Sequence, residues 1–431
     1  TGIRAREAVE RAHSLGIDVI VTDHHLPEAT LPPACAILDP KQPGCRYPEK
    51  NLCGAGVTLK LVQALLSRLG WPEQKQRRLV ASLLKMVAIA TVADVVPLTG
   101  ENRIIVKHGL AGLASVRNLG LRALLEAAGF PAGEAPSAGQ VAFRIAPRIN
   151  AAGRMASADD VIRLFLTADE AQARELAAQL HTLNQERQET EAGIIASILE
   201  ECSRTPVGAE RAALVFSGQG WHPGVVGIVA NRLVERFHRP AVVLSVDPET
   251  GVARGSGRSI PAFHLLEALE SMHDLFVRFG GHRQAAGLTL PAGRIEEFRQ
   301  RLNRYAAGRL RPEDLIPRQE FDARLLLEEI NDSSVADILR LAPFGFGNPS
   351  PLFAVEGVEV AGEPAVYKEN HLRLRLRQNG RHVWVKAWNF RDRAGELIPG
   401  SALDVALQVE SDPVSAARGF PAWSLTLRDV R

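Results

Sequence analysis

Apolar and polar residues alternate most strictly near the C-terminus of the chain. From residue 371 to 377 leucines alternate with arginines, so the leucines face one side of a β-strand and Arg373, Arg375 and Arg377 face the other. Asn379-Gly380 follows, a pair typical of a tight hairpin turn. Residues 381–388 alternate again, which predicts the return strand of a β-hairpin.

The two tryptophans of the return strand could face either solvent or the core. If its valines point inward, Trp384, Lys386 and Trp388 face outward, and indoles beside cations can hold a single nucleic-acid strand without reading its sequence. The alternative, with both tryptophans in the core, fits the pattern equally well. Further predicted strands complete a small closed β-barrel over residues 318–431.

Short uninterrupted apolar runs mark the rest of the chain. Residues 17–22 form a β-branched run after a helical pattern, which predicts a buried parallel strand. Two similar runs, at 212–216 and 241–246, flank a helix that opens near residue 221. The predicted fold class is α/β, with a parallel-sheet lobe over residues 1–155 and a second α/β lobe over residues 207–310.

Residues 156–206 join the two predicted lobes. From Asp169 to Arg204 the pattern is helical and contains no proline. A helix of about 30 residues would reach roughly 45 Å, enough to connect two domains. Its polar middle, residues 184–189, fits a solvated bridge between lobes.

Length, net charge and cysteine spacing limit the classes of protein that fit this sequence. With 431 residues, the chain is too long for one ordinary core, and it has no apolar run of about 18 residues that could span a membrane. A net charge of +2 means that nucleic-acid binding would need local basic patches. Four cysteines without metal-binding spacing indicate reduced thiols in a cytoplasmic protein.

Because the chain begins with Thr1 and enters a helical pattern at once, we expect that an N-terminal part is absent.

The strongest candidate chemistry is the triplet Asp23-His24-His25. It follows the predicted strand at 17–22, and ligands of α/β sheets gather at the carboxyl ends of strands. Imidazole and carboxylate suit a divalent metal such as Mn²⁺ or Zn²⁺, and carboxylate also suits Mg²⁺. Asp94 is a lone acid in an apolar segment and should have a partner, either a helix end or a metal shared with His24. The plainer alternative is two loop histidines that follow a strand.

Three segments combine arginine with small residues. Residues 143–155 contain three arginines and Asn150, and arginine is the preferred partner of phosphate oxygens. Residues 254–259 and 280–287 are glycine-rich and basic, and turns of this kind can form an anion-binding nest. Two such turns within about thirty residues favour a phosphate-backbone site, whereas a salt-bridged arginine at a domain junction remains the alternative for the first segment.

These motifs occur in the order of a known superfamily. The Asp23-His24-His25 triplet, the segments 92–98 and 150–154, and the glycine-rich segment 280–287 resemble the DHH phosphoesterase superfamily, and most of all its RecJ family of single-strand-specific 5′-to-3′ DNA exonucleases. The resemblance covers essentially the whole chain. It implies a DHH domain, a connecting helix, a DHH-associated domain and a C-terminal OB-fold.

The resemblance also implies roles for individual residues. His24 and Asp94 would be metal ligands, and Asp23 and His25 would support the site or contact phosphate as catalytic residues. Substrate would be bound by a larger set of residues: Asn150, Arg154, Arg254, Arg258, Ser259, Gly281 and His282. The implied cofactors are Mn²⁺ or Mg²⁺ in a two-metal site that hydrolyses phosphodiesters. Because the family's first two metal motifs precede the triplet, we expect an incomplete ligand set, weak metal binding and slow cleavage.

We therefore expect a single-stranded-DNA exonuclease of repair and recombination. Its expected partner is single-stranded DNA, with a helicase and a single-strand-binding protein as candidate protein partners and no membrane. Two alternatives stay open: a DHH phosphodiesterase that acts on short oligonucleotides or cyclic dinucleotides, and a non-catalytic scaffold that binds single strands.

Overall fold

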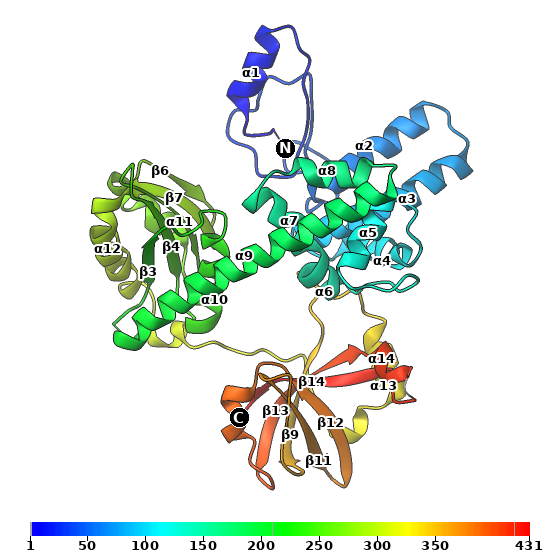
Figure 1. The fold of residues 1–431 in the computed structure, drawn as a ribbon, viewed down its shortest axis with the longest axis vertical. Coiled ribbons are helices and arrows are strands. Elements are labelled where there is room, and N and C mark those ends of the chain that lie inside the picture. Colours follow the sequence, from blue (N-terminus) through cyan, green and yellow to red (C-terminus); the bar gives the residue numbers. More distant parts are fainter. Residues whose placement is uncertain (1, 209, 418) are drawn as a thin grey trace. The chain divides into compact units, whose positions relative to one another are not determined.

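The computed structural model describes residues 2–208, 210–417 and 419–431 (Figure 1). Contacts divide the chain into two units. The first unit holds residues up to 116, residues 130–146 and residues 319–431, and the second holds residues 117–129 and 147–318. Of the three sheets in the described residues, two therefore belong to the first unit and one to the second.

The N-terminal part of the first unit contains a two-stranded parallel sheet. Strand β1 (Ile20–Thr22) pairs with β2 (Ala36–Leu38), as the parallel-sheet prediction requires. Val21 is buried, but Ile17 and Ile20 are more than half exposed. The prediction of a buried strand is therefore wrong for Ile17 and Ile20, because no segment of the described residues covers their side chains. The helices of this part are α1 (Arg6–Ser14), α2 (Gly54–Arg68), α3 (Glu73–Ala93), α4 (Gly100–Gly112) and α6 (Ala138–Gln140).

The C-terminal part of the first unit is a seven-stranded sheet that closes on itself. Five of its strands form the ring, because β11 pairs with both β12 and β9 (orange to red in Figure 1). The leucines of β11 are buried and its arginines exposed, and Asn379 and Gly380 both adopt positive φ at the hairpin turn, as the alternation predicts. The elements are β8 (Ala323–Arg324), α13 (Asp332–Leu339), β9 (Leu352–Val360), β10 (Ala365–Tyr367), β11 (His371–Gln378), β12 (Arg381–Ala387), β13 (Ala402–Ser411), α14 (Pro413–Ala416) and β14 (Trp423–Val430).

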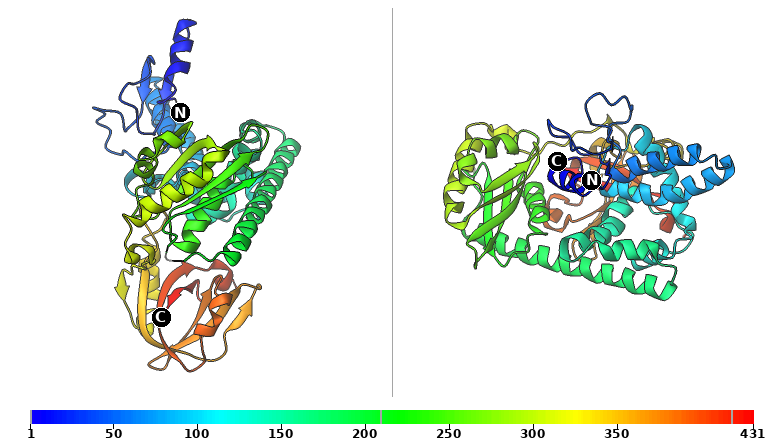
Figure 2. Two further views of the ribbon diagram at one scale, coloured as in Figure 1. Left: turned by 90° about the vertical axis from the view of Figure 1, so that its left-hand side faces the viewer. Right: turned by 90° about the horizontal axis from the view of Figure 1, so that it is seen from above.

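The second unit is built on a five-stranded mixed sheet in the order β3-β4-β5-β7-β6. The strands of this sheet are the green to yellow-green arrows in Figure 2. Among its described strands only β3 and β4 pair in parallel, and Gly255 of β5 is required because a Cβ there would lie 2.5 Å from the Val243 carbonyl oxygen. The strands are β3 (Leu214–Gln219), β4 (Ala241–Asp247), β5 (Val252–Arg258), β6 (Arg278–Gly281) and β7 (Ala285–Pro291). The helices are α5 (Leu119–Ala127), α7 (Ala146–Met155, whose first residue belongs to the other unit), α8 (Asp159–Leu166), α9 (Glu170–Arg204), α10 (Val226–Phe237), α11 (Leu265–Glu270) and α12 (Ile295–Ala307).

Helix α9 is the long helix that the sequence predicts, and Asp169 caps it by accepting a hydrogen bond from the Ala171 amide. Its middle is not simply solvated, however. Asn184 and Arg187 are buried, and Arg187 pairs with Glu191 at 2.6 Å. Glu191 also pairs with Arg232 of α10, a neighbouring helix that the sequence pattern could not identify as a partner.

Two further sequence predictions concern the whole chain. The structure has all four cysteines as free thiols. Within the described ranges, no helix is both long enough and apolar enough to cross a membrane.

Candidate functional site

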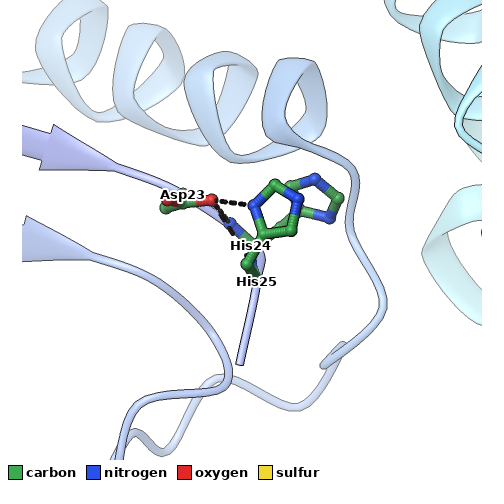
Figure 3. A group of neighbouring side chains, drawn as sticks. All are labelled: Asp23, His24 and His25. Carbon is green, nitrogen blue, oxygen red and sulfur yellow. Dashed lines mark hydrogen bonds and ion pairs between the residues drawn. The ribbon is translucent and has the colours of Figure 1, made fainter. Parts of the chain in front are cut away.

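Asp23 organises the triplet at the carboxyl end of β1 (Figure 3). Its carboxylate is buried and accepts hydrogen bonds from the backbone amides of Ile3, His24 and His25. It also bonds to Nδ1 of His25 at 2.7 Å. Burial alone would raise the pKa of Asp23, but these hydrogen bonds outweigh it and hold the pKa far below its usual range. Asp23 is therefore ionised at neutral pH, and it holds Nδ1 of His25 and leaves Nε2 available.

His24 and Asp94 come together from distant parts of the sequence. Asp94 ends helix α3, and its Oδ2 lies 3.4 Å from Nε2 of His24. Burial lowers the pKa of His24 more than Asp94 raises it, and His25 and Lys41 contribute in the same direction as burial. A neutral imidazole beside a carboxylate is the form in which both groups bind a metal.

The donor atoms fit a divalent ion. One donor atom each from Asp23, His24 and His25 lie within 4.8 Å of one another, and Asp94 adds a carboxylate at His24. Nitrogen and oxygen donors of this kind suit Mn²⁺, and carboxylate oxygens also suit Mg²⁺. Because Asp23 is already engaged in four hydrogen bonds, His24 and Asp94 are the best placed to be direct ligands.

A second cluster, in the other unit, is cationic. Arg154 of α7 donates a hydrogen bond to the Gly224 carbonyl just before helix α10. A Cβ on Gly227, in the first turn of α10, would lie 3.3 Å from the guanidinium of Arg258. Burial and Arg187 lower the pKa of Arg154, and burial and Arg154 lower that of Arg258. Two guanidinium groups thus lie near one helix N-terminus, an arrangement that an anion would stabilise.

The other predicted residues of this unit have different surroundings. Strands β5 and β7 pair with Arg258 opposite Ala285, so the two glycine-rich segments are neighbours in the sheet. Asn150 is exposed one helical turn before Arg154 on α7, and Arg254 and His282 are also exposed. Gly281 allows a close approach, because a Cβ there would lie 2.3 Å from the Ala285 carbonyl oxygen. Ser259 is buried and donates to the Phe263 carbonyl, which favours a structural role.

The C-terminal ring has an exposed aromatic and basic face. Trp384 is 54% exposed and its ring contacts the guanidinium of Arg373, and Trp388 is 37% exposed and packs against Tyr367 and His371. Of the two placements open to the tryptophans, the structure has the outward one. Arg375 lies opposite Trp384 on the neighbouring strand.

Two cations of this face are paired. Arg377 forms an ion pair with Glu359, and Nζ of Lys386 lies 2.6 Å from Asp412, which is buried. Burial opposes ionisation of Asp412, but the Lys386 ammonium and the Ser415 amide lower its pKa to about 2. Lys386 therefore has a structural partner in addition to its predicted role.

The Asp412–Lys386 pair predicts a pH dependence of stability. Because the folded-state pKa of Asp412 lies below the ordinary value of 3.8, the pair stabilises the fold above about pH 4 and is lost as the pH falls toward 2. After allowance for the partly exposed Lys386, the contribution is about 1–2 kcal/mol. Urea denaturation between pH 6 and pH 3 should show this loss in the wild type and its absence in Asp412→Asn. Equal pH dependence of the two proteins would contradict the assignment.

Sequence reasoning missed part of the cationic cluster. His222, Gly224 and Gly227 surround the start of α10, and Nδ1 of His222 accepts a hydrogen bond from the Gly224 amide. The sequence pattern places Arg187 in a solvated stretch of helix, although its positive charge lowers the pKa of Arg154. The histidine and the closely spaced glycines at a helix start were the available signal for this site.

Family models match three parts of the chain. The "DHH family, N-terminal domain" model matches residues 1–91, the "DHHA1 domain" model matches residues 210–308, and the "RecJ OB domain" model matches residues 321–415. The matched ranges contain the triplet, the strands of the second unit and most of the C-terminal ring, respectively.

Individual proteins extend these matches. The chain is 41% identical over 406 residues to the single-stranded-DNA-specific exonuclease RecJ of Bacillus subtilis, an alignment that covers 94% of this chain and 50% of that protein. It is 35% identical over 405 residues to RecJ of Haemophilus influenzae, covering 91% of this chain and 70% of that protein. The crystal structure of Thermus thermophilus RecJ with Mn²⁺ superposes with a TM-score of 0.82 at 34% identity, covering 100% of this chain and 60% of that one. The chain thus spans about half to two thirds of the length of most of these relatives.

Proposed function

This chain belongs to the RecJ family, and on that basis we propose that it acts in a single-strand-specific 5′-to-3′ DNA exonuclease of repair and recombination. The observation that carries the proposal is the contact between His24 and Asp94, a histidine–carboxylate pair suited to a divalent metal, in a chain whose relatives are exonucleases. Since the chain spans only part of those relatives, the activity, substrate and partners of the whole protein are part of the proposal.

We assign the metal to Mn²⁺ or Mg²⁺, both of which occur in crystal structures of Thermus thermophilus RecJ. His24 and Asp94 would hold it. When bound, such ions supply an activated water and stabilise charge on the reacting phosphate oxygens. Asp23 fixes the orientation of His25, whose exposed ring can donate to a phosphate oxygen or accept a proton through Nε2. These few donors are a sparse set for two ions, so we expect weak metal binding by these 431 residues.

Substrate binding is assigned to the two other clusters. Arg154 and Arg258, beside the start of α10, would bind a backbone phosphate. Asn150, Arg254, Gly281 and His282 would extend this contact, and the exposed face with Arg373, Arg375 and Trp384 would stack bases. A helicase and a single-strand-binding protein remain candidate partners, and four free thiols fit a reducing compartment such as the cytoplasm.

The test is hydrolysis of end-labelled DNA. With Mn²⁺ at high concentration, we expect slow release of nucleotides from the 5′ end of a single strand, still slower attack on blunt duplex, and no cleavage in EDTA. Faster cleavage of dinucleotides than of long strands would favour the small-substrate phosphodiesterase. Tight binding without cleavage, in a preparation that binds Mn²⁺, would favour the scaffold.

Arg258→Ala is expected to weaken binding of a single-stranded oligonucleotide by about 10-fold, because a charge-assisted hydrogen bond to phosphate is worth about 1.5–3 kcal/mol. Arg309→Ala is the matched control: this arginine of the same unit is exposed, packs over the Tyr305 ring and lies outside the predicted binding segments. Fluorescence anisotropy at fixed salt measures both affinities. Equal losses for the two variants would indicate nonspecific attraction.

Trp384→Ala is expected to weaken the same binding by about 10-fold, since stacking on one aromatic ring contributes about 1–3 kcal/mol per base. Trp71→Ala is the control, because Trp71 also carries a cation, Lys75, over its ring but lies between helices α2 and α3. Binding of the oligonucleotide should quench tryptophan fluorescence. This quenching should be smaller in Trp384→Ala than in the wild type, and unchanged in Trp71→Ala. Unchanged affinity would remove this face from the binding site.

A further inference from the structure

Asp94 is followed by a strained residue. Val95 adopts a φ of +54°, a left-handed conformation that a β-branched residue rarely takes, and its side chain is 61% exposed. Such a conformation costs about 1–3 kcal/mol and persists only where the surrounding structure enforces it. On one side, the amides of Asp94 and Val95 are fixed to the carbonyls of Ala90 and Val92 at the end of α3. The segment on the other side, residues 97–98, must therefore also be held.

That segment is held by residues 341–348, here called the connector hairpin. The Leu98 amide donates to the Phe346 carbonyl at 2.7 Å, and Leu98 is buried. Arg103, on helix α4, donates to the Leu341 carbonyl at 2.6 Å. The hairpin contributes backbone carbonyls rather than side chains to these hydrogen bonds. Its backbone conformation therefore matters more for them than the identity of its side chains.

Two glycines allow this approach. A Cβ on Gly345 would lie 2.7 Å from Cδ1 of Leu98, and a Cβ on Gly347 would lie 2.8 Å from Cβ of Pro97. The hairpin itself is closed by mutual backbone bonds between Gly345 and Asn348, whose side chain also donates to the Leu341 and Pro343 carbonyls. The hairpin backbone at Gly345 and Gly347 thus packs directly against Leu98 and Pro97, with no room for a Cβ on either glycine.

We infer that the connector hairpin is a positioning element for Asp94. It fixes Pro97 and Leu98, which forces the turn at Val95 and holds the Asp94 carboxylate beside His24. Strand β9 of the C-terminal ring begins only four residues after the hairpin. The C-terminal ring and the metal-binding segment are therefore mechanically linked. The inference rests on the proposed function in that it takes Asp94 as a metal ligand.

The test compares two glycine substitutions in the whole chain. Gly345→Ala introduces a methyl group against Leu98, whereas Gly395→Ala introduces one into open space and is the matched control. Neither glycine has positive φ, so the added methyl is the only difference. We expect Gly345→Ala to speed hydrogen exchange in peptides covering residues 92–99. We also expect it to weaken Mn²⁺ binding about 10-fold, because loss of a residue that orients a metal ligand lowers metal affinity by at least about this factor. Free Mn²⁺ is measured by electron paramagnetic resonance.

A double variant separates positioning from general damage. Leu98→Val removes Cδ1 but keeps an atom near Cγ, which lies 3.4 Å from the Cβ site of Gly345. Leu98→Val combined with Gly345→Ala should therefore recover slow exchange and Mn²⁺ affinity relative to Gly345→Ala alone. A structural defect unrelated to this contact would not be rescued.

Each contrary outcome has a distinct meaning. Unchanged exchange at residues 92–99, or faster exchange with unchanged Mn²⁺ affinity, overturns the positioning role. Equal Mn²⁺ affinity in the wild type and in Asp94→Asn contradicts the proposed metal site and the inference together. The behaviour of Asp94→Asn therefore distinguishes failure of the proposed function from failure of the hairpin inference alone.

Discussion

Replacement of Asp94 by Asn is expected to lower Mn²⁺-dependent hydrolysis of single-stranded DNA by about 100-fold or more, because loss of even an outer partner of a metal site costs about 10–100-fold. The substitution keeps the size of the side chain and its place at the end of α3, but it removes the charge 3.4 Å from Nε2 of His24. Part of the lost activity should be recovered at high Mn²⁺ concentration, because loss of one ligand lowers the affinity for Mn²⁺ and a higher concentration refills the site.

The measurement is the initial rate of nucleotide release over a series of Mn²⁺ concentrations. Glu73→Gln, at the opposite end of the same helix and exposed beside Arg77, controls for loss of one negative charge. Its rate should match the wild type. Wild-type activity with an unchanged Mn²⁺ dependence in Asp94→Asn would remove Asp94 from the metal site.

Replacement of Asp23 by Ala should have the largest effect on stability. The carboxylate is only 2% exposed, and its removal leaves the backbone amides of Ile3 and His24 without this acceptor. Each unsatisfied buried group costs about 1–3 kcal/mol, so we expect the N-terminal segment to lose about 3 kcal/mol. That is a large share of the roughly 5–15 kcal/mol typical of a whole domain.

Native-state hydrogen exchange resolves this local effect, since it measures the opening free energy of residues 20–38 separately from the rest of the chain. Asp18→Ala is the matched control, because Asp18 is exposed just before the same strand. Asp23→Asn should be intermediate: the amide still accepts from the backbone but binds Nδ1 of His25 less strongly. Equal opening free energies for Asp23→Ala and Asp18→Ala would contradict the organising role of Asp23.

Several features were predictable from the sequence because they depend on local patterns. The helical pattern of α9 contains no proline and begins at an Asp N-cap, so its boundaries follow from nearest neighbours along the chain. Alternation over β11 and the Asn379-Gly380 turn define the hairpin and which residues face out. The Asp23-His24-His25 triplet at a strand end likewise marked the metal-binding candidate.

Other features depended on contacts between distant residues. No pattern predicted that Asp412 would pair with Lys386, or that Arg187 would be buried and act on Arg154. The exposure of Ile20 depends on which distant segments cover that face of β1. Each of these outcomes depends on a partner more than ten residues away, and a local periodicity carries no information about that partner.

The sequence by itself determined the order of elements, the chemistry available at each strand end and membership of a phosphoesterase superfamily. These follow from side-chain periodicity and from short motifs whose residues are neighbours. Only the tertiary structure decided which groups meet: Asp94 beside His24, Arg154 and Arg258 at the start of α10, and the connector hairpin against Leu98. The physical reason is that these contacts are made by packing of buried backbone and side chains from separate segments, which sequence spacing does not encode.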